Sequence, residues 1–256
     1  MSAPPGALYL VPNALDLGAP EPLPALDDVL PLGVIRTAAR LTHWVAENAK
    51  TTRAFLKRVD AVVPLAQKVQ ALAIVELPRA QKGAPKLAPP KLAPLLAAAL
   101  QGHDMGLISE AGLPAVADPG SDLVQAAHEL GIEVIALPGP SSLLLALAAS
   151  GLNGQSFAFV GYMPVEATVR GARIRELEAL SRRQAQTQLM IETPYRNEAL
   201  LAALIMNLEA ATELSVSCGL TMPQAYSRTA TVAQWRAGTH RLPTDVPVVF
   251  SLLASK

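Results

Sequence analysis

The segment Gly106-Leu-Ile-Ser-Glu-Ala-Gly-Leu-Pro-Ala-Val-Ala-Asp-Pro-Gly120 decides the expected fold. The apolar run from Met105 to Ser109 is typical of a buried strand. A loop with two glycines, two prolines and two carboxylates follows, so the chain turns sharply directly after the strand. In an open α/β sheet, ligands bind beyond the carboxyl ends of the strands. The segment therefore predicts either a ligand-binding loop or an ordinary structural turn.

A second element of the same kind follows about twenty residues later. The expected strand Glu133 to Leu137 runs into Pro138-Gly139-Pro140-Ser141-Ser142 and then into a leucine-rich helix. Ser141 or Ser142 can cap that helix. The helix start equally suits a carboxylate or polar ligand group, and both interpretations stay open. The sequence contains neither a dinucleotide-binding Gly-x-Gly-x-x-Gly nor a phosphate-binding P-loop.

Strand-like and helix-like segments alternate along the rest of the chain, which predicts an α/β fold. Gly151 to Gln155 breaks a helix before a new strand, so we expect two α/β lobes, residues 1–152 and 153–256. The proline-rich stretch from Leu77 to Pro94 reads as an exposed, irregular loop. The expected strands are Leu8 to Val11, His43 to Ala46, Ala73 to Leu77, Met105 to Ser109, Glu133 to Leu137, Phe157 to Val160, Thr187 to Ile191, Leu214 to Cys218, Ala225 to Thr231 and Val246 to Leu253. The expected helices are Val29 to Leu41, Lys50 to Arg58, Pro90 to Gln101, Leu123 to Leu130, Ser141 to Ala149, Arg170 to Arg183 and Arg196 to Leu208.

Composition excludes several classes of protein. With 256 residues, 51% of them hydrophobic and 16% charged, the chain is far from a disordered composition. The single cysteine, Cys218, excludes an internal disulfide, and the four histidines show no metal-ligand spacing, so no metal site is expected. We find no secretion signal and no apolar run of the roughly 18 residues that cross a bilayer. A cytoplasmic protein without a membrane span is expected.

Charge is distributed unevenly although 21 basic residues balance 21 acidic ones. The segment from Arg36 to Lys91 holds eleven Lys and Arg but only three acids, whereas Leu92 to Val169 holds seven acids and no Lys or Arg. Such a basic segment can attract a polyanion such as RNA, or it can be an ordinary solvated surface. Both interpretations stay open.

Four motifs in this order and spacing resemble the tetrapyrrole methylase family of S-adenosylmethionine-dependent methyltransferases, closest to its 16S ribosomal RNA ribose 2′-O-methyltransferase branch. Tyr9-Leu-Val-Pro-Asn13 and Val45-Ala-Glu-Asn-Ala-Lys-Thr-Thr-Arg53 fit the same family. The resemblance spans about Leu8 to Leu253. The four motifs are Ile108-Ser-Glu-Ala-Gly-Leu-Pro-Ala-Val-Ala-Asp-Pro-Gly120, Leu137-Pro-Gly-Pro-Ser141, Phe159-Val-Gly-Tyr-Met-Pro164 and Glu192-Thr-Pro-Tyr-Arg196.

The resemblance implies a two-lobed enzyme, each lobe a mixed sheet flanked by helices, which works as a homodimer and holds S-adenosylmethionine between its lobes. By the same resemblance, both lobes supply cofactor contacts. The first lobe would supply Pro12, Ser109, Glu110, Ala111, Gly112, Ala115, Val116, Ser141 and Ser142. The second lobe would supply Met190, Ile191, Glu192, Cys218, Gly219 and Pro247.

Catalysis of methyl transfer depends mainly on positioning the acceptor in line with the methyl group. A carboxylate could also take the proton of an acceptor hydroxyl. The candidates for such a base are Glu47, Glu110, Asp118 and Glu192, each of which could equally be a loop or surface acid.

Departures from the ribosomal RNA branch leave the acceptor open. That branch reads Thr-Pro-Ile-Gly-Asn-Leu where this chain reads Val11-Pro-Asn-Ala-Leu15, and Thr221-Met-Pro-Gln224 is more similar to the tetrapyrrole branch. Three functions therefore stand beside one another: methylation of RNA or a ribosomal subunit, methylation of a small molecule such as a tetrapyrrole, and a non-catalytic paralogue that only binds S-adenosylmethionine.

Overall fold

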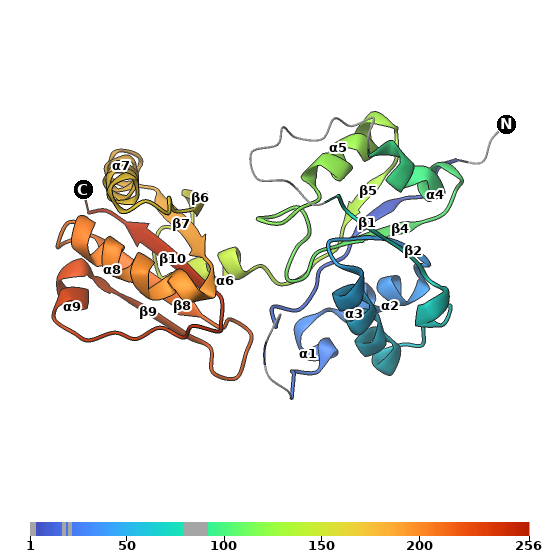
Figure 1. Cartoon of the computed structure of the whole chain (residues 1–256), viewed down its shortest axis with the longest axis horizontal. Coiled ribbons are helices and arrows are strands. Elements are labelled where there is room, and N and C mark those ends of the chain that lie inside the picture. The colour runs from blue at the N-terminus through green and yellow to red at the C-terminus, as the bar shows by residue number, and fades with distance from the viewer. Residues whose placement is uncertain (1–3, 17–18, 20–21, 79–91, 256) are drawn as a thin grey trace. The chain divides into compact units, whose positions relative to one another are not determined.

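The computed structural model describes residues 4–16, 19, 22–78 and 92–255, and these form two compact units. The first unit contains residues 4–16 and 24–140. The second contains residues 141–255, together with the described residues between 19 and 23. Each unit has its own five-stranded sheet and its own hydrophobic core. Figure 1 shows both units as layers of helices on a sheet.

The first unit is a parallel sheet with the strand order β3-β2-β4-β1-β5. All parallel strands need crossover connections, and helices supply most of them. The strands are β1 (Leu8–Leu10), β2 (His43–Ala46), β3 (Ala73–Glu76), β4 (Met105–Ile108) and β5 (Val134–Ala136). The helices are α1 (Leu26–Val29), α2 (Leu32–Arg40), α3 (Ala49–Val62), α4 (Ala97–Leu100) and α5 (Ser121–Glu129), with short 3₁₀ turns at η1 (Val69–Ala71) and η3 (Ala93–Leu96).

Helices cover both faces of this first sheet. Side chains from α1, α2 and α3 form one core cluster around Trp44 and Ile108. Side chains from α4 and α5 form another around Leu8 and Leu107. Strand β4 is buried along its whole length. The polar residues that follow it in the sequence therefore lie in the loop after its carboxyl end.

The second unit is a mixed sheet with the strand order β6-β7-β10-β8-β9. Only β6 and β7 run parallel, and the other neighbours are antiparallel. The strands are β6 (Phe157–Tyr162), β7 (Thr187–Glu192), β8 (Glu213–Cys218), β9 (Tyr226–Thr231) and β10 (Val248–Leu253). The helices are α6 (Ser142–Ser150), α7 (Ala167–Gln184), α8 (Asn197–Asn207) and α9 (Val232–Arg236), with a 3₁₀ turn at η4 (Pro194–Arg196).

Helix α6 belongs to the second unit. Leu143 and Leu147 pack with Leu189 and Val249 on one face of the second sheet, while α7, α8 and α9 supply the core on the other face. The Ser150 carbonyl also accepts a hydrogen bond from Thr229 Oγ1 at 2.7 Å. The division between units therefore lies at Pro140, one helix before the boundary expected at residues 152 and 153.

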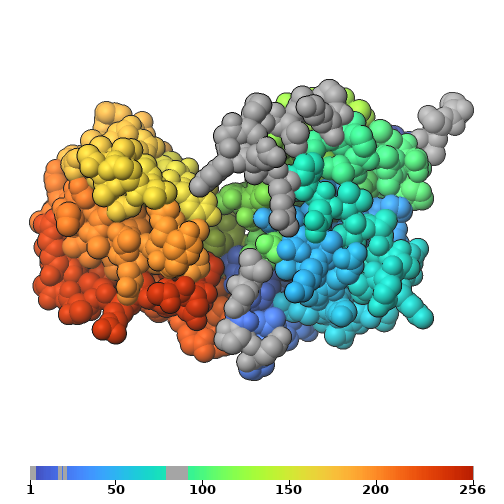
Figure 2. Space-filling view, in the orientation of Figure 1, coloured from blue at the N-terminus to red at the C-terminus, as the bar shows by residue number. Residues whose placement is uncertain are grey.

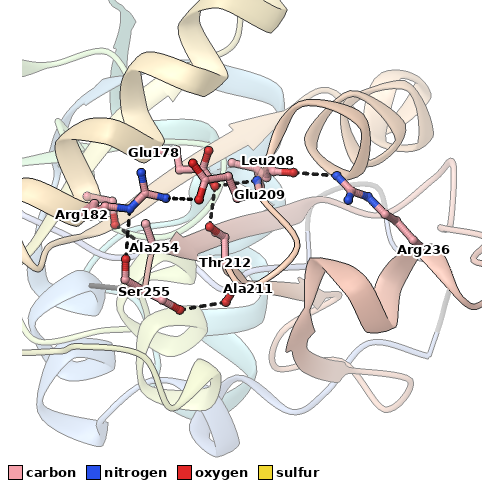
Figure 3. A network of polar contacts seen from close by, with 10 residues as sticks. Glu178, Arg182, Leu208, Glu209, Ala211, Thr212, Arg236, Ala254 and Ser255 are labelled. Atoms are coloured by element: carbon pink, nitrogen blue, oxygen red, sulfur yellow. Dashed lines mark hydrogen bonds and ion pairs between the residues drawn. The ribbon is translucent and has the colours of Figure 1, made fainter.

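A buried carboxylate ties α7 to the turn that leads into β8 (Figure 3). Glu178 is 4% exposed and accepts hydrogen bonds from the Glu209 amide at 2.8 Å and from Thr212 Oγ1 at 2.5 Å. Arg182, one turn later, reaches the Glu209 carboxylate and the Ser255 carbonyl. These contacts fix the end of α8 and the end of β10 against α7.

The α/β fold class and all ten expected strands are confirmed, each within about two residues. Two expectations are corrected. The first sheet is parallel throughout, not mixed, because helical or turn-containing crossovers separate its paired strands. The helix expected from Val29 to Leu41 is two helices, because Pro31 ends α1 and occupies the N-cap of α2.

Two further expectations concern the segment before α4 and the absence of a membrane-spanning helix. Most of the loop expected from Leu77 to Pro94 lies outside the described residues, as does the start of the helix expected from Pro90 to Gln101. The described part of that helix is a 3₁₀ turn followed by α4. Among the described residues, no helix combines the length and the apolar character that crossing a bilayer requires.

Candidate functional site

The carboxyl ends of β1 and β4 are held together by Asn13. Its backbone forms a two-way bridge with Gly112, at 2.9 and 3.1 Å, and its side-chain Nδ2 donates to the carbonyls of Ser109 and Glu110 at 3.3 and 3.0 Å. Asn13 is 6% exposed, so these hydrogen bonds are shielded from water. The side-chain amide of Asn13 therefore holds the first residues of the loop after β4 in place.

Glu47 joins the neighbouring strand β2 to the same loop. It is the first residue after β2, and its Oε2 accepts a hydrogen bond from the Glu110 amide at 3.0 Å. The Glu47 amide in turn donates to the Ile108 carbonyl at 3.1 Å. Three strand ends, those of β1, β2 and β4, therefore share one hydrogen-bonded edge.

Asp118 lies close enough to this edge to sense its charges. Burial, and then the nearby carboxylate of Glu47, raise the pKa of Asp118 to about 6, although the Ser109 hydroxyl acts in the opposite direction. Glu110 contributes a further, smaller increase. Three of the four candidate bases, Glu47, Glu110 and Asp118, thus form one electrostatically coupled group. A carboxyl with this pKa is mostly ionised near pH 7 and is a stronger base than an ordinary aspartate.

The loop that follows β4 has an unusual backbone. Gly112 and Gly120 have positive φ values, +67° and +129°. Two alanines also have a positive φ and lie in the left-handed region, Ala115 at 66° and Ala117 at 62°. Alanine rarely adopts this region because its Cβ crowds the backbone. Such strain persists where surrounding contacts impose it and is frequent at ligand sites. The expected interpretation of this loop as a binding element gains support.

The β5 end packs directly onto the β1 turn. A Cβ on Gly139 would lie 2.2 Å from Pro12 Cβ, so only glycine allows this approach. At Gly112, a Cβ would meet Leu15 at 3.2 Å and the Pro140 carbonyl at 3.5 Å. The turn around Gly112 is therefore closely packed, and a side chain at this position would press against Leu15.

The serines after β5 do not act as caps. Ser141 occupies the N-cap position of α6 and is 7% exposed, but its hydroxyl makes no capping hydrogen bond. Ser142 is the first residue of the helix. The expectation that one of them caps α6 is wrong for the Ser141 hydroxyl, although the extended Ser141 backbone is typical of an N-cap residue.

In the second unit, the other candidate residues meet at one edge of the sheet. Val248, the first residue of β10, pairs with Glu192 at the end of β7 and with Cys218 at the end of β8. Pro247 is exposed and accepts a hydrogen bond from the Gly219 amide at 3.3 Å. Met190, Glu192 and Cys218 are buried, and Ile191 and Gly219 are partly exposed.

Glu192 differs from the other candidate bases because it has a cationic partner. Its Oε2 lies 2.8 Å from Arg196 Nη2, and its Oε1 accepts from the Thr193 amide at 2.9 Å. Within its unit, Glu192 therefore contacts the turn from Thr193 to Arg196 that leads into α8. The candidate bases that share an edge are the three in the first unit.

Sequence reasoning missed Asn13 as a site residue. The signal was weak: an asparagine directly after a proline at a strand end is typical of any turn. Val116, by contrast, was a candidate and is 44% exposed on the loop. Among the described residues, no group of three or more His, Cys, Asp or Glu side chains could hold a metal ion.

The structure is thus an α/β protein of two units with polar residues gathered where parallel strands end, the place at which open α/β sheets commonly bind ligands. This chain is a member of the family of tetrapyrrole (corrin/porphyrin) methylases, whose family model matches residues 37–235.

Curated relatives carry the name ribosomal RNA small subunit methyltransferase I. The protein of that name from Mesorhizobium japonicum is 41% identical over 155 residues, which cover 60% of this chain and 51% of the relative. The one from Streptococcus pyogenes serotype M3 is 30% identical over 191 residues, covering 75% and 57%. The chain thus spans little more than half the length of these relatives.

Solved structures support the fold. A uroporphyrin-III-C-methyltransferase from Thermus thermophilus has a TM-score of 0.53 at 20% identity, with 97% of this chain and 92% of that chain covered. A cobalamin synthesis related protein from Corynebacterium diphtheriae has a TM-score of 0.57 at 15% identity, with 98% and 99% covered. At these identities the likeness concerns the fold alone.

Proposed function

We propose that this protein is an S-adenosylmethionine-dependent methyltransferase that acts on the RNA of the small ribosomal subunit. The observation that carries the proposal is the edge where β1, β2 and β4 end, with Asn13, Gly112 and the carboxylates of Glu47, Glu110 and Asp118. The curated relatives, which bear the name of an RNA methyltransferase, support the choice of acceptor.

The residues at this edge fit S-adenosylmethionine. When bound, this cofactor supplies a methyl group on a positively charged sulfonium. Carboxylates favour a cation nearby, and at position 112 a Cβ would already lie 3.2 Å from Leu15, so glycine permits the close approach there. Hydrogen bonds to Asn13 and Glu47 hold the backbone of Ser109, Glu110 and Gly112 in place at the strand end. These residues would hold the cofactor, with Ala115 and Val116 on the strained loop next to them.

Asp118 is the best candidate for the base among the described residues. Its raised pKa, about 6, leaves it ionised at neutral pH and able to take a proton from an acceptor hydroxyl. Glu47 raises that pKa and at the same time orients the Glu110 amide. The role of Glu47 is therefore positioning, and that of Asp118 is proton transfer.

Cofactor contacts from the second unit are part of the same proposal. Met190, Ile191, Glu192, Cys218, Gly219 and Pro247 gather at one edge of the second sheet, which agrees with a shared role. A homodimer and a cytoplasmic location complete the proposal on the strength of the family resemblance, and sedimentation of the purified protein tests the first.

Calorimetry with S-adenosylmethionine tests the cofactor. We expect binding by the natural chain and loss of binding by Gly112→Val, whose side chain would press against Leu15 and displace the turn around position 112. Gly131→Val is the matched control, because Gly131 has nearly the same φ, +69°, as Gly112, while nothing lies within 4 Å of a Cβ there. Absence of binding by the natural chain would refute the enzyme assignment.

Transfer of a labelled methyl group tests the acceptor. Purified small ribosomal subunits and a metabolite extract are offered separately to the protein. Label in the ribosomal RNA supports the proposal, and label in a small molecule alone would replace RNA with a metabolite as the acceptor. Asp118→Asn should slow transfer without weakening cofactor binding.

A further inference from the structure

The basic segment from Arg36 to Lys91 is the feature that the fold and the sheet-edge site leave unexplained. Two of its arginines serve the fold. Arg40 pairs with Asp104 at 2.5 Å and lies over the Tyr9 ring, and Arg58 pairs with Asp16 at 2.8 Å. Arg79, Lys82, Lys86 and Lys91 lie outside the described residues. The question is what the remaining five cations do.

Among the described residues, the acids of the segment form no ion pair with these cations. Glu47 accepts from the Glu110 amide, Asp60 from the Leu65 amide at 3.0 Å, and Glu76 from the Ala49 amide at 2.8 Å. Each of the three carboxylates is thus engaged with the backbone. Within the described parts of the chain, the five cations without an acidic partner are Arg36, Lys50, Arg53, Lys57 and Lys68.

Three of the five form a stripe along α3. Lys50, Arg53 and Lys57 are all exposed and follow one another at three and four residues, so they share one face of the helix. The opposite face, with Phe55, is buried in the core of the first unit. Figure 2 shows α3 as a light-blue area on the surface of that unit. We call these three residues the α3 stripe.

The stripe does not stabilise its own helix. Lys50 lies in the first turn of α3, where the helix dipole disfavours positive charge, and that turn has no acidic residue. Arg53 and Lys57 are also like charges one turn apart, which repel. Arg53 makes one contact, to the Ala49 carbonyl of its own helix at 3.3 Å. The first amides are already capped by Asn48 and Glu76.

The shape and chemistry of the stripe match a nucleic-acid backbone. From Lys50 to Lys57 the helix rises about 10 Å, a length that holds about three phosphates of one strand. A membrane-binding helix would need large exposed apolar side chains beside the cations. On α3 those side chains face the core, and the other exposed residues of the helix, Ala54, Asp60 and Ala61, are small or acidic.

We propose that the α3 stripe, Lys50, Arg53 and Lys57, binds backbone phosphates of the RNA substrate. The inference rests on the proposed function for its choice of RNA. Helix α3 begins two residues after Glu47, so the stripe starts at the sheet edge that carries the candidate site. Phosphates held along α3 would place the adjoining nucleotides near that edge.

The test compares two triple variants of the full chain. The first, Lys50→Gln/Arg53→Gln/Lys57→Gln, removes the stripe. The matched control, Lys68→Gln/Arg183→Gln/Arg241→Gln, removes three exposed cations outside α3 that also have no acidic partner in the described chain. Both lose the same charge. Circular dichroism melts establish that both fold.

The readout is binding of a fluorescein-labelled RNA hairpin, and of small ribosomal subunits, across salt concentrations from about 50 to 200 mM. We expect the stripe variant to bind about 10-fold to 100-fold more weakly, and the slope of log affinity against log salt to fall by about 2 to 3. The control variant should keep both the affinity and the slope within about twofold.

Three results would overturn the inference: unchanged binding by the stripe variant, an equal loss in the control variant, or binding of the natural chain to phosphatidylserine vesicles and not to RNA. Calorimetry with S-adenosylmethionine separates this inference from the proposed function. A chain that binds RNA through the stripe but neither binds the cofactor nor transfers methyl groups would refute the function and leave the stripe as an RNA-binding surface.

Discussion

Asn13 shows how much one side chain can do at a strand end. Its amide donates to the carbonyls of Ser109 and Glu110, both close to a buried strand. In Asn13→Ala these acceptors lose their donor, so we expect the free energy of unfolding to fall by about 1 to 3 kcal/mol. Urea unfolding measures the change.

Thr37→Ala is the control for Asn13. Thr37 Oγ1 also donates to a backbone carbonyl, that of Gly33 at 3.0 Å, but on the exposed side of α2. Its removal should change stability by about 0.5 kcal/mol or less. Equal effects of the two substitutions would show that the Asn13 amide does not hold the strand ends together.

Asp118 predicts a dependence of stability on pH. Its pKa is about 6 in the folded protein, and about 4 is the ordinary value in an unfolded chain. The folded state therefore binds the proton more tightly, and ionisation of Asp118 opposes folding. This destabilisation is absent below about pH 4, grows between about pH 4 and 6, and is complete above that range.

Asp118→Asn removes the charge and so should stabilise the protein above about pH 6, with a gain that disappears towards about pH 4. Urea unfolding at several pH values measures the gain relative to the natural chain. A gain that is the same at every pH would contradict the raised pKa. Because the same substitution is expected to slow methyl transfer, stability and activity should change in opposite directions.

At the scale of elements, Glu178 and Glu176 on α7 offer a direct comparison. Glu178 is buried and accepts hydrogen bonds from Glu209 and Thr212, whereas Glu176 is exposed and, among the described residues, pairs only with Arg173 on the same helix. Glu178→Ala leaves buried donors without an acceptor, so we expect a loss of about 2 to 4 kcal/mol. Glu176→Ala should cost about 0.5 kcal/mol or less.

Chemical denaturation of both glutamate variants measures these losses. Glu178→Gln keeps one acceptor oxygen and should lie between the two. If Glu178→Ala proves as stable as Glu176→Ala, the contacts drawn in Figure 3 do not contribute to the packing of α7.

Strands were predictable because their apolar, β-branched runs have a clear local pattern, as in Val134–Ala136 and Val248–Leu253. Short helices were less so. Helix α1 has four residues, too few for a periodic pattern. Helix α9 was missed although the sequence contains its capping box, Thr231 with Gln234, which the structure shows in full.

The candidate site was predictable in its glycines and acids and not in its contacts. The loop after β4 was recognisable from Gly112, Asp118 and Gly120 alone. The hydrogen bond from Asn13 to Ser109 joins residues 96 positions apart, so it exists only because β1 and β4 are neighbours in the sheet. No local pattern contains that information. The left-handed alanines are likewise imposed by the surroundings of the loop.

At the scale of the whole molecule, two units with separate cores predict two unfolding events. Differential scanning calorimetry should resolve two transitions. Asn13→Ala should lower the midpoint of one and Glu178→Ala that of the other. A single transition that both substitutions shift equally would show that the units unfold as one.

Positions 115 and 117 are alanines although their backbone angles favour glycine, and this restricts the conformations open to the loop. Glycine would adopt the same backbone angles with less strain, but it would also allow the segment many other backbone conformations. A methyl group at each position narrows those choices. The loop therefore has some backbone strain at these two positions but a more restricted set of conformations than glycines would allow.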